Sequence, residues 1–123
     1  MLDFDDLLLE TLALFEAGEL PEEITQRFTY LLVDEFQDID VLQYRLVRAW
    51  AKGCKSLLAI GDPDQSIYGF RGSDAACFDR LAEDIPGLRV VRLTQNYRST
   101  PEVLGCALPV IGHNPGGARS LLP

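Results

Sequence analysis

Hydrophobic residues recur every three or four positions at the start of the chain, which is typical of a helix with one buried face. The apolar positions of this pattern are Phe4, Leu7, Leu8, Leu12 and Phe15. Their spacing predicts an amphipathic helix over residues 3–17, with Asp3 as its N-cap and Gly18 as its stop. Pro21 is then expected to open a short second helix, because proline is favoured in the first helical turn.

Short apolar runs alternate with helical patterns along the rest of the chain. Strands are predicted for three runs: Thr29–Val33, Ser56–Ile60 and Leu88–Leu93. The first two are expected to be buried, and the third only partly, because it contains Arg89 and Arg92. Helices are predicted for three other segments: Asp40–Lys52, Ser73–Glu83 and a segment that begins at Ser99. The last helix has Ser99 as its expected cap, with proline in the first turn and Glu102 three residues after the cap. Pro109 is expected to kink or end this helix.

The order of these elements predicts an α/β fold with a parallel sheet in three layers. About two dozen residues separate the first two strands, which leaves room for a helical crossover between parallel neighbours. Continuous apolar strands are typical of parallel sheets that helices cover on both faces. Ligands of such sheets bind outside the carboxyl ends of the strands. Three polar segments fall at those ends: Asp34–Glu35, Gly61–Asp62 and Thr94–Arg98.

The charge balance restricts the partners that the chain can bind by itself. It carries 11 Lys and Arg against 19 Asp and Glu, a formal net charge of −8. A domain that binds nucleic acid alone normally has a basic stripe, because phosphate contacts supply most of the non-specific affinity. Any nucleic-acid role must therefore be local or use charge from elsewhere. No apolar run approaches a membrane span and the N-terminus is acidic, so a cytoplasmic protein with no membrane partner is expected.

Asp34 and Glu35 follow the first apolar strand and are the leading candidates for chemistry. Neighbours on a strand point to opposite faces, so both can serve one site only if the strand ends at Asp34 and the chain turns. An apolar strand followed by Asp-Glu is typical of a Walker B element. There the Asp holds Mg²⁺, and the Glu orients or deprotonates the attacking water. Capping of the next helix is the alternative role for acids in this segment, with Asp38 or Asp40 as the candidate.

The loop that follows the second strand, residues 61–72, carries a second group of candidates. Gln65 offers an amide that both donates and accepts hydrogen bonds, as a sensor of a γ-phosphate or of water requires. Tyr68 and Phe70 either pack beneath the loop or form a stacking platform for nucleic-acid bases. Base stacking needs no net basic charge, so it is compatible with the acidic composition.

Arg98 stands beside the start of the last predicted helix. A structural role would pair its guanidinium with Glu102 or Asp34. A chemical role would bring it to a γ-phosphate in the transition state, because guanidinium groups bind carboxylates and phosphates in the same bidentate geometry. The residue pattern alone leaves both open.

Three segments, in this order and spacing, closely resemble helicase motifs II, III and IV of the UvrD/Rep-like superfamily 1 DNA helicases. The segments are Tyr30–Asp38, Gly61–Gly72 and Leu93–Ser99. The opening Asp3–Leu8 resembles the helix that leads back into that family's first RecA-like domain, so the resemblance covers about residues 1–112. It implies a partial RecA-like P-loop NTPase domain. Residues 1–93 would form the C-terminal part of the first RecA-like domain, and residues 94–123 would hold motif IV, the start of the second domain and an irregular tail.

The resemblance also implies roles for individual residues in ATP hydrolysis. Asp34 and Glu35 would hold the Mg²⁺ of MgATP, and Glu35 would act as the catalytic base. Gln65 and Arg98 would contact the γ-phosphate, with Gln65 coupling it to DNA, and Tyr97 would stack near the adenine. Single-stranded DNA would contact three loop residues: Tyr68, Phe70 and Arg71. The family often has tryptophan in place of this phenylalanine, so weaker stacking is expected there. No direct chemistry is expected of the remaining residues of the first segment, Phe36, Gln37 and Asp38.

No GxxxxGK[ST] loop, which cradles phosphates in nucleotide sites, occurs in the sequence. In the family that loop lies well upstream of the acidic pair. The chain is therefore expected to be an internal piece of a larger ATP-dependent helicase that moves on single-stranded DNA, 3′ to 5′, with the rest of that chain as its partner. By itself it is expected to be inactive. Two other interpretations remain open: a different Mg²⁺-dependent phosphohydrolase, and a non-catalytic interaction module or degenerate helicase paralogue.

Overall fold

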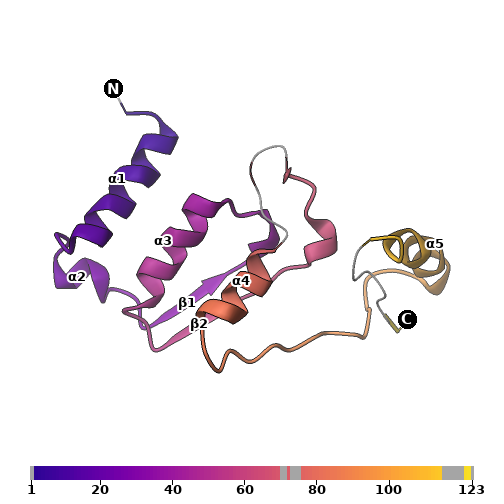
Figure 1. Ribbon diagram of the computed structural model, residues 1–123. Helices are drawn as coiled ribbons and strands as arrows, with labels where there is room; N and C mark the ends of the chain where they lie inside the picture. The colour runs from indigo at the N-terminus through magenta and orange to yellow at the C-terminus, as the bar shows by residue number, and fades with distance from the viewer. Residues whose placement is uncertain (1, 70–71, 73–75, 115–120, 123) are drawn as a thin grey trace. The chain divides into compact units, whose positions relative to one another are not determined.

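The computed structural model describes residues 2–69, 72, 76–114 and 121–122 (Figure 1). The chain divides into two compact units, Met1–Asp84 and Ile85–Pro123, and each is described by itself. The predicted domain boundary between residues 93 and 94 stays a prediction. Within the described ranges, no helix is long and apolar enough to cross a membrane.

The first unit begins with two helices where the sequence predicts them. α1 spans Phe4–Ala17 and α2 spans Glu22–Thr25. Asp3 caps α1 reciprocally with Asp6, since the carboxylate of each accepts a hydrogen bond from the backbone N–H of the other. Gly18 ends the helix with a φ of 70°, a left-handed conformation that glycine adopts without steric cost. Both helices, the cap and the stop are confirmed.

A two-stranded parallel sheet follows. β1 spans Tyr30–Val33 and β2 spans Ser56–Ala59, in a register that pairs Leu32 with Leu58 and Val33 with Ala59. α3, Val41–Ala51, connects the strands and packs against α1 (Figure 1). The parallel pairing and the helical crossover are confirmed.

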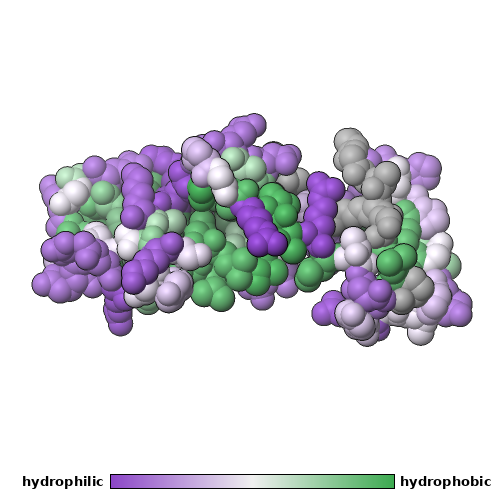
Figure 2. Space-filling view, turned by 90° about the horizontal axis from the view of Figure 1, so that it is seen from below, coloured by the Kyte–Doolittle hydropathy of each residue, from purple (hydrophilic) through white to green (hydrophobic). Residues whose placement is uncertain are grey.

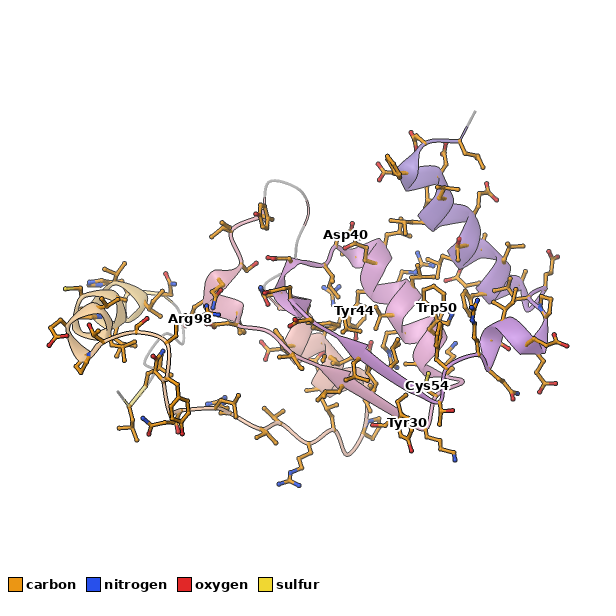
Figure 3. All side chains as sticks on the ribbon, turned by 180° about the vertical axis from the view of Figure 1, so that it is seen from behind. Tyr30, Asp40, Tyr44, Trp50, Cys54 and Arg98 are labelled. Atoms are coloured by element: carbon orange, nitrogen blue, oxygen red, sulfur yellow. The ribbon has the colours of Figure 1, made fainter. Side chains whose placement is uncertain are left out.

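Asp40 caps α3, at the position labelled in Figure 3. Its carboxylate accepts from the backbone N–H of Gln43 at 2.8 Å, and the Gln43 side chain accepts from the backbone N–H of Asp40 at 3.1 Å. Asp38, the other candidate for this cap, instead ends the short 3₁₀ helix Phe36–Asp38. Of the two candidates, Asp40 therefore has the capping role.

The centre of the first unit's core is Phe36, which is 0% exposed. Its ring packs edge-on against Tyr44 of α3 and Phe78 of α4, with ring centroids 6.3 and 5.2 Å apart. α4 spans Cys77–Asp84, which confirms the later part of the helix predicted over Ser73–Glu83, whereas its predicted cap Ser73 lies outside the described residues. The residue that directly follows the acidic pair is thus anchored in the core.

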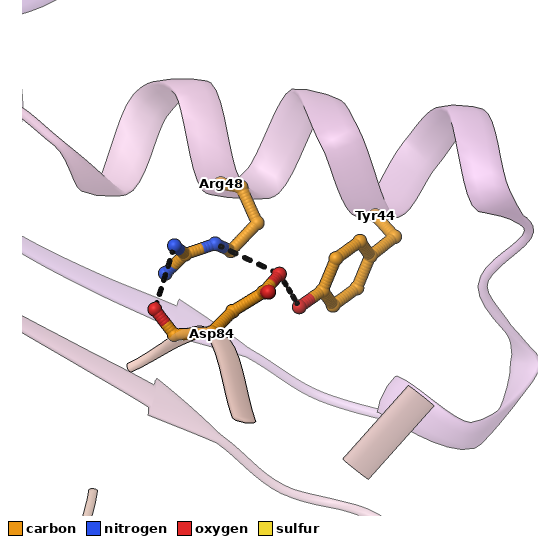
Figure 4. Close-up of polar contacts among 3 residues, drawn as sticks. All are labelled: Tyr44, Arg48 and Asp84. Atoms are coloured by element: carbon orange, nitrogen blue, oxygen red, sulfur yellow. Dashed lines mark hydrogen bonds and ion pairs between the residues drawn. The ribbon is translucent and has the colours of Figure 1, made fainter. Parts of the chain in front are cut away.

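The C-terminal end of α4 is linked to α3 through one residue, Asp84 (Figure 4). The Tyr44 hydroxyl donates to Asp84 Oδ2 at 2.6 Å, and Arg48 Nε lies 3.7 Å from the same oxygen. A guanidinium nitrogen of Arg48 also donates to the Asp84 backbone carbonyl at 3.1 Å. Burial, followed by the hydrogen bond to the Asp84 carboxylate, raises the pKa of Tyr44 above its ordinary value.

The described residues cover one face of the sheet and leave the other exposed. Leu31, Val33, Leu57 and Ala59 are half-buried, whereas Leu32 and Leu58, which pair across the strands, are 66% and 50% exposed. Hydrophobic side chains gather in this region on the face seen in Figure 2. The α/β class is confirmed, but the third layer predicted from the continuous apolar strands is not formed by the described residues.

The second unit corrects two predictions. Leu88–Leu93 was predicted as a third strand, yet it has no regular secondary structure, and Val90, Val91 and Leu93 are exposed. Apolar composition does not make a strand without a hydrogen-bonded neighbour, and the described residues provide none there. The last helix, α5, spans Pro101–Ile111 with Thr100 rather than Ser99 as its N-cap. Proline at the first helical position forces the residue before it into an extended conformation, and Thr100 has φ −70° and ψ 160°.

Pro109 does not end α5, because the helix continues for two residues beyond it to Ile111. A proline removes one hydrogen bond from the ladder and crowds the preceding turn. This position is close to the C-terminal end of the helix, so few hydrogen bonds remain to be disturbed after it. The helix itself is confirmed.

Candidate functional site

The two strands of the first unit end side by side, and polar residues follow each of them. Asp34 and Glu35 come directly after β1, and Gly61 and Asp62 follow β2. The ladder continues beyond the strands, since Ile60 N–H donates to Val33 O at 2.8 Å and Phe36 N–H donates to Ile60 O at 2.9 Å. The predicted convergence of these two segments is therefore confirmed. The third predicted segment, Thr94–Arg98, belongs to the second unit.

Glu35 turns the chain with an unusual backbone conformation. Its φ of 50° and ψ of 41° are left-handed, and no other non-glycine residue in the described part of the chain has a positive φ. Such a conformation costs an L-residue on the order of 1–3 kcal/mol and persists only where its surroundings hold it. The condition for both acids to serve one site, that the strand ends and the chain turns here, is met.

The carboxylates of Asp34 and Glu35 are both on exposed residues. Asp34 Oδ1 accepts a hydrogen bond from the Glu35 backbone N–H at 2.9 Å, which holds the turn. In the described ranges, no group of three or more His, Cys, Asp or Glu side chains gathers around a common point. Two exposed carboxylates fit Mg²⁺ bound to a nucleotide, because Mg²⁺ keeps several waters and is usually held by one or two carboxylates together with substrate phosphates.

Gln65 lies in a short 3₁₀ helix, Pro63–Gln65, in the segment that follows β2. Asp62 caps this turn by accepting from the Asp64 backbone N–H at 3.1 Å. The other carboxylate oxygen of Asp62 accepts from Gln65 Nε2 at 3.0 Å. Gln65 is exposed, so Asp62 holds one end of its amide while the residue remains accessible to a ligand.

Gln37 is the residue of this site that sequence reasoning missed. Its side chain is 1% exposed and lies between the segment that follows β1 and the segment that follows β2. Its Nε2 donates to Glu35 Oε2 at 2.7 Å, and its Oε1 accepts from the Asp62 backbone N–H at 3.0 Å. Gln37 therefore joins the acidic pair to the loop that carries Gln65. The available signal was its place in the sequence, two residues after Glu35 and next to an aromatic residue that enters the core.

The three residues predicted to contact DNA follow β2 in the sequence. Tyr68 is 37% exposed, so a large part of its side chain remains accessible. Phe70 and Arg71 lie outside the described residues. The structure thus leaves the predicted roles of all three as predictions.

Tyr97 and Arg98 belong to the second unit, and Figure 3 labels Arg98 there. Tyr97 is 92% exposed, and Arg98 is exposed as well. The Asn96 side chain accepts from the backbone N–H groups of Arg98 and Ser99 at 3.0 and 2.7 Å, which shapes the turn before α5. Within this unit both predicted nucleotide-binding side chains are accessible.

Comparison with known proteins is consistent with this arrangement of the first unit. Residues 1–86 match the family described as the UvrD/REP helicase N-terminal domain. The chain is 46% identical over 114 residues to the ATP-dependent DNA helicase PcrA of Staphylococcus epidermidis, which is 92% of this chain and 16% of that protein. It is 44% identical over 113 residues to the PcrA of Leuconostoc citreum, or 91% of this chain and 15% of that protein.

A third relative gives the same result. The PcrA helicase of Staphylococcus aureus is 45% identical over 114 residues, which cover 92% of this chain and 16% of that protein. The chain thus spans about one sixth of the length of these relatives. The family match extends over most of the chain and includes the acidic pair, Gln37 and Gln65. The chain belongs to the UvrD/REP helicase N-terminal domain family.

Proposed function

We propose that the chain is part of an ATP-dependent DNA helicase in which ATP hydrolysis drives movement on single-stranded DNA, in the 3′ to 5′ direction. The observation that carries the proposal is the pairing of Asp34–Glu35 with the Gln65 loop at the adjoining ends of two parallel strands. Relatives that share 44–46% identity with the chain are named ATP-dependent DNA helicases. In this proposal the first unit is part of a three-layer RecA-like domain, and its segments correspond to motifs II and III.

Each carboxylate of the pair has a separate role in the proposal. Asp34 binds Mg²⁺, which would supply positive charge at the phosphate oxygens. Glu35 orients the attacking water and accepts its proton. The left-handed backbone of Glu35 supports this role, because the chain turns directly after the strand and both acids can then serve one site. Gln65 contacts the γ-phosphate through the part of its amide that Asp62 does not engage.

The second unit would supply the remaining nucleotide contacts. Arg98 binds the γ-phosphate and stabilises the charge that develops in the transition state, and Tyr97 stacks on the adenine. The exposure of both side chains supports these roles. Tyr68, Phe70 and Arg71 contact single-stranded DNA, with the two rings stacking on bases and the arginine pairing with phosphate.

Replacement of Glu35 tests the hydrolytic role. In the full-length chain that carries this segment, Glu35→Gln should lower kcat for DNA-stimulated ATP hydrolysis by about 10²–10⁴-fold, because the amide cannot accept the proton of the water. Nucleotide affinity, measured with a fluorescent ATP analogue, should change little. Glu23→Gln, an exposed glutamate of α2, is the matched control and should retain wild-type turnover.

Survival of turnover in Glu35→Gln would show that the assignment of the base is wrong. The 123-residue chain belongs in the same assay. We expect no multiple-turnover hydrolysis from it, because a phosphate-binding GxxxxGK[ST] loop does not occur in its sequence. Turnover by this chain that Glu35→Gln abolishes would contradict that expectation.

Replacement of Tyr68 tests the DNA contact. In the full-length chain, Tyr68→Ala should weaken binding of single-stranded DNA by about 1–3 kcal/mol, because one base loses its stacking partner. Tyr68→Phe keeps the ring and should bind nearly as well as wild type. The measurement is fluorescence anisotropy with a labelled oligonucleotide. Equal affinity for wild type and Tyr68→Ala would assign the ring to packing beneath the loop.

A further inference from the structure

The side chain of Gln37 is buried, and every part of its amide has a partner. Nε2 donates to Glu35 Oε2 at 2.7 Å and lies 3.5 Å from Asp38 Oδ2, while Oε1 accepts from the Asp62 N–H at 3.0 Å. Burial of an amide is costly unless its hydrogen bonds are made. A residue that only filled space at this position would be apolar, so the amide itself requires an explanation.

The orientation of this amide is fixed by its partners. The Glu35 carboxylate can only accept hydrogen bonds, and the Asp62 backbone N–H can only donate one. A reversed amide would place its oxygen against the carboxylate and its NH₂ group against the N–H. Gln37 is therefore a directional link, with its donor on the acidic pair and its acceptor on the neighbouring loop.

The link continues to Gln65. Asp62 Oδ2 accepts from Gln65 Nε2 at 3.0 Å, so hydrogen bonds connect Glu35 with Gln65 through Gln37 and Asp62. A second contact supports the path, because Ser66 Oγ donates to the Gln37 backbone carbonyl at 3.2 Å. The loop that carries Gln65 thus holds both the side chain and the backbone of Gln37.

The exposed end of this path needs such support. Glu35 is an exposed residue, and an unrestrained glutamate side chain samples many rotamers. The hydrogen bond from buried Gln37 selects a position of the carboxylate relative to the strand ends. A general base must be held within hydrogen-bond reach of the water that it deprotonates, and small misplacements lower the rate strongly.

We propose that Gln37 is a positioning residue that holds the Glu35 carboxylate in place and couples it to the position of Gln65. The proposal rests on the function proposed above, in which Glu35 is the base and Gln65 contacts the γ-phosphate. When nucleotide binding shifts the Gln65 loop, the Asp62 N–H group moves with the loop. Gln37 is bonded to this N–H, so it passes the displacement on to the Glu35 carboxylate. Gln37 itself touches neither the nucleotide nor the water.

The test uses the full-length chain and two variants of Gln37. Gln37→Met has similar length and volume but no hydrogen-bonding amide. Gln37→Glu retains an acceptor for the Asp62 N–H but places a second carboxylate against Glu35. Gln26→Met is the matched control, because Gln26 also donates to a glutamate, Glu22, but is an exposed residue that directly follows α2.

We expect Gln37→Met to lower kcat for DNA-stimulated ATP hydrolysis by about 10–100-fold, which is the effect of losing a hydrogen bond to a charged group. The KM for ATP should stay within about twofold, because the residue makes no nucleotide contact. Gln37→Glu should lower kcat as well, because its carboxylate repels that of Glu35 where the amide donates a hydrogen bond to it. A purely structural residue would lower the folded fraction and leave kcat per folded molecule at the wild-type value.

The outcomes separate this inference from the proposed function. If Glu35→Gln retains turnover, the proposed function fails, whatever Gln37 does. If Glu35→Gln abolishes turnover but both Gln37 variants keep the wild-type kcat, the positioning role is overturned.

A measurement on the wild-type chain remains decisive if the variants do not fold. The side-chain amide protons of Gln37 should exchange with solvent far more slowly than those of Gln26, as followed by NMR with selective labelling. Exchange at equal rates would overturn the proposal, because the hydrogen bond to Glu35 would then not persist.

Discussion

At the scale of the residue, the site depends on Glu35 and on the neighbours that hold its backbone. Phe36 and Gln37, which follow it, are the most deeply buried pair of the segment, at 0% and 1% exposure. The chain can place these two side chains in the interior while it leaves Glu35 at the surface because Glu35 takes the left-handed turn. Burial of its neighbours thus offsets the cost of the turn.

Gly61 is the residue of the neighbouring loop that this arrangement requires most strictly. A Cβ atom at this position would lie 2.2 Å from Gln37 Oε1 and 3.0 Å from the Phe36 backbone nitrogen. Gln37 cannot move aside without losing its hydrogen bonds to Glu35 and Asp62. Gly61→Ala should therefore lower the free energy of unfolding by about 1–3 kcal/mol, measured by urea denaturation.

Gly69→Ala is the control for this substitution, because a Cβ at Gly69 would meet no atom of the described residues within 4 Å. It should change the free energy of unfolding by less than about 0.5 kcal/mol. Equal stability of the two variants would mean that the Gln37 amide does not lie against Gly61. In the full-length chain, Gly61→Ala should also lower ATP turnover, as Gln37→Met does, because the added Cβ displaces the Gln37 amide.

At the scale of the element, local sequence predicts the helices well and the strands less well. The cap of α1 and the box that Asp40 forms with Gln43 depend on side chains three residues apart, so the sequence alone reveals them. Leu88–Leu93 failed as a strand because pairing depends on a neighbour that local sequence does not specify. Gln37 was missed for the same reason, since its acceptor contact comes from Asp62, 25 residues away.

The contact between α3 and α4 predicts a dependence of stability on pH. Tyr44 has a raised pKa, first because it is buried and then because it donates to the Asp84 carboxylate. A group whose pKa is raised on folding contributes stability that is complete below its unfolded pKa, about 10 for tyrosine, and is lost as the pH rises through the folded pKa. This contribution should therefore be present at neutral pH and decline above pH of about 10.

Tyr44→Phe isolates the contribution of this hydroxyl. The variant should be less stable than the wild type by about 1–2 kcal/mol at pH 8, because the ring is kept and Arg48 still pairs with Asp84. Urea unfolding at a series of pH values should show the difference shrinking above pH of about 10. A difference that stays constant to high pH would show that the hydroxyl does not donate to Asp84 in solution.

At the scale of the whole molecule, the continuous apolar strands predict a third layer that the described residues do not form. Leu31-Leu32-Val33 and Leu57-Leu58 are apolar on both faces, which predicts cover on both. The side chains on one face are half-buried, while Leu32, Leu58 and Ile60 on the other remain about half exposed or more. The pattern of the strands therefore predicts a further layer that the described residues do not contain, in a chain that spans about one sixth of the length of its relatives.

Substitutions on the two faces test whether a further layer covers the sheet in the longer chain. Replacing both Leu32 and Leu58 by threonine introduces β-branched residues, which suit a strand, and removes apolar surface. In the 123-residue chain this change should alter the free energy of unfolding by less than about 0.5 kcal/mol per site and reduce binding of a hydrophobic dye. In the full-length chain it should cost at least about 2 kcal/mol, because the side chains would then be buried.

Leu57→Thr, on the covered face, is the control and should destabilise the chain in both contexts. Thermal unfolding of all variants compares the two faces of the sheet with each other. It also compares the 123-residue chain with the full-length chain. Equal and small effects of the Leu32 and Leu58 substitutions in the two contexts would mean that this face stays exposed in the longer chain. The three-layer arrangement proposed for the first unit would then be wrong, whereas the two-stranded sheet and the site at its carboxyl ends would be unaffected.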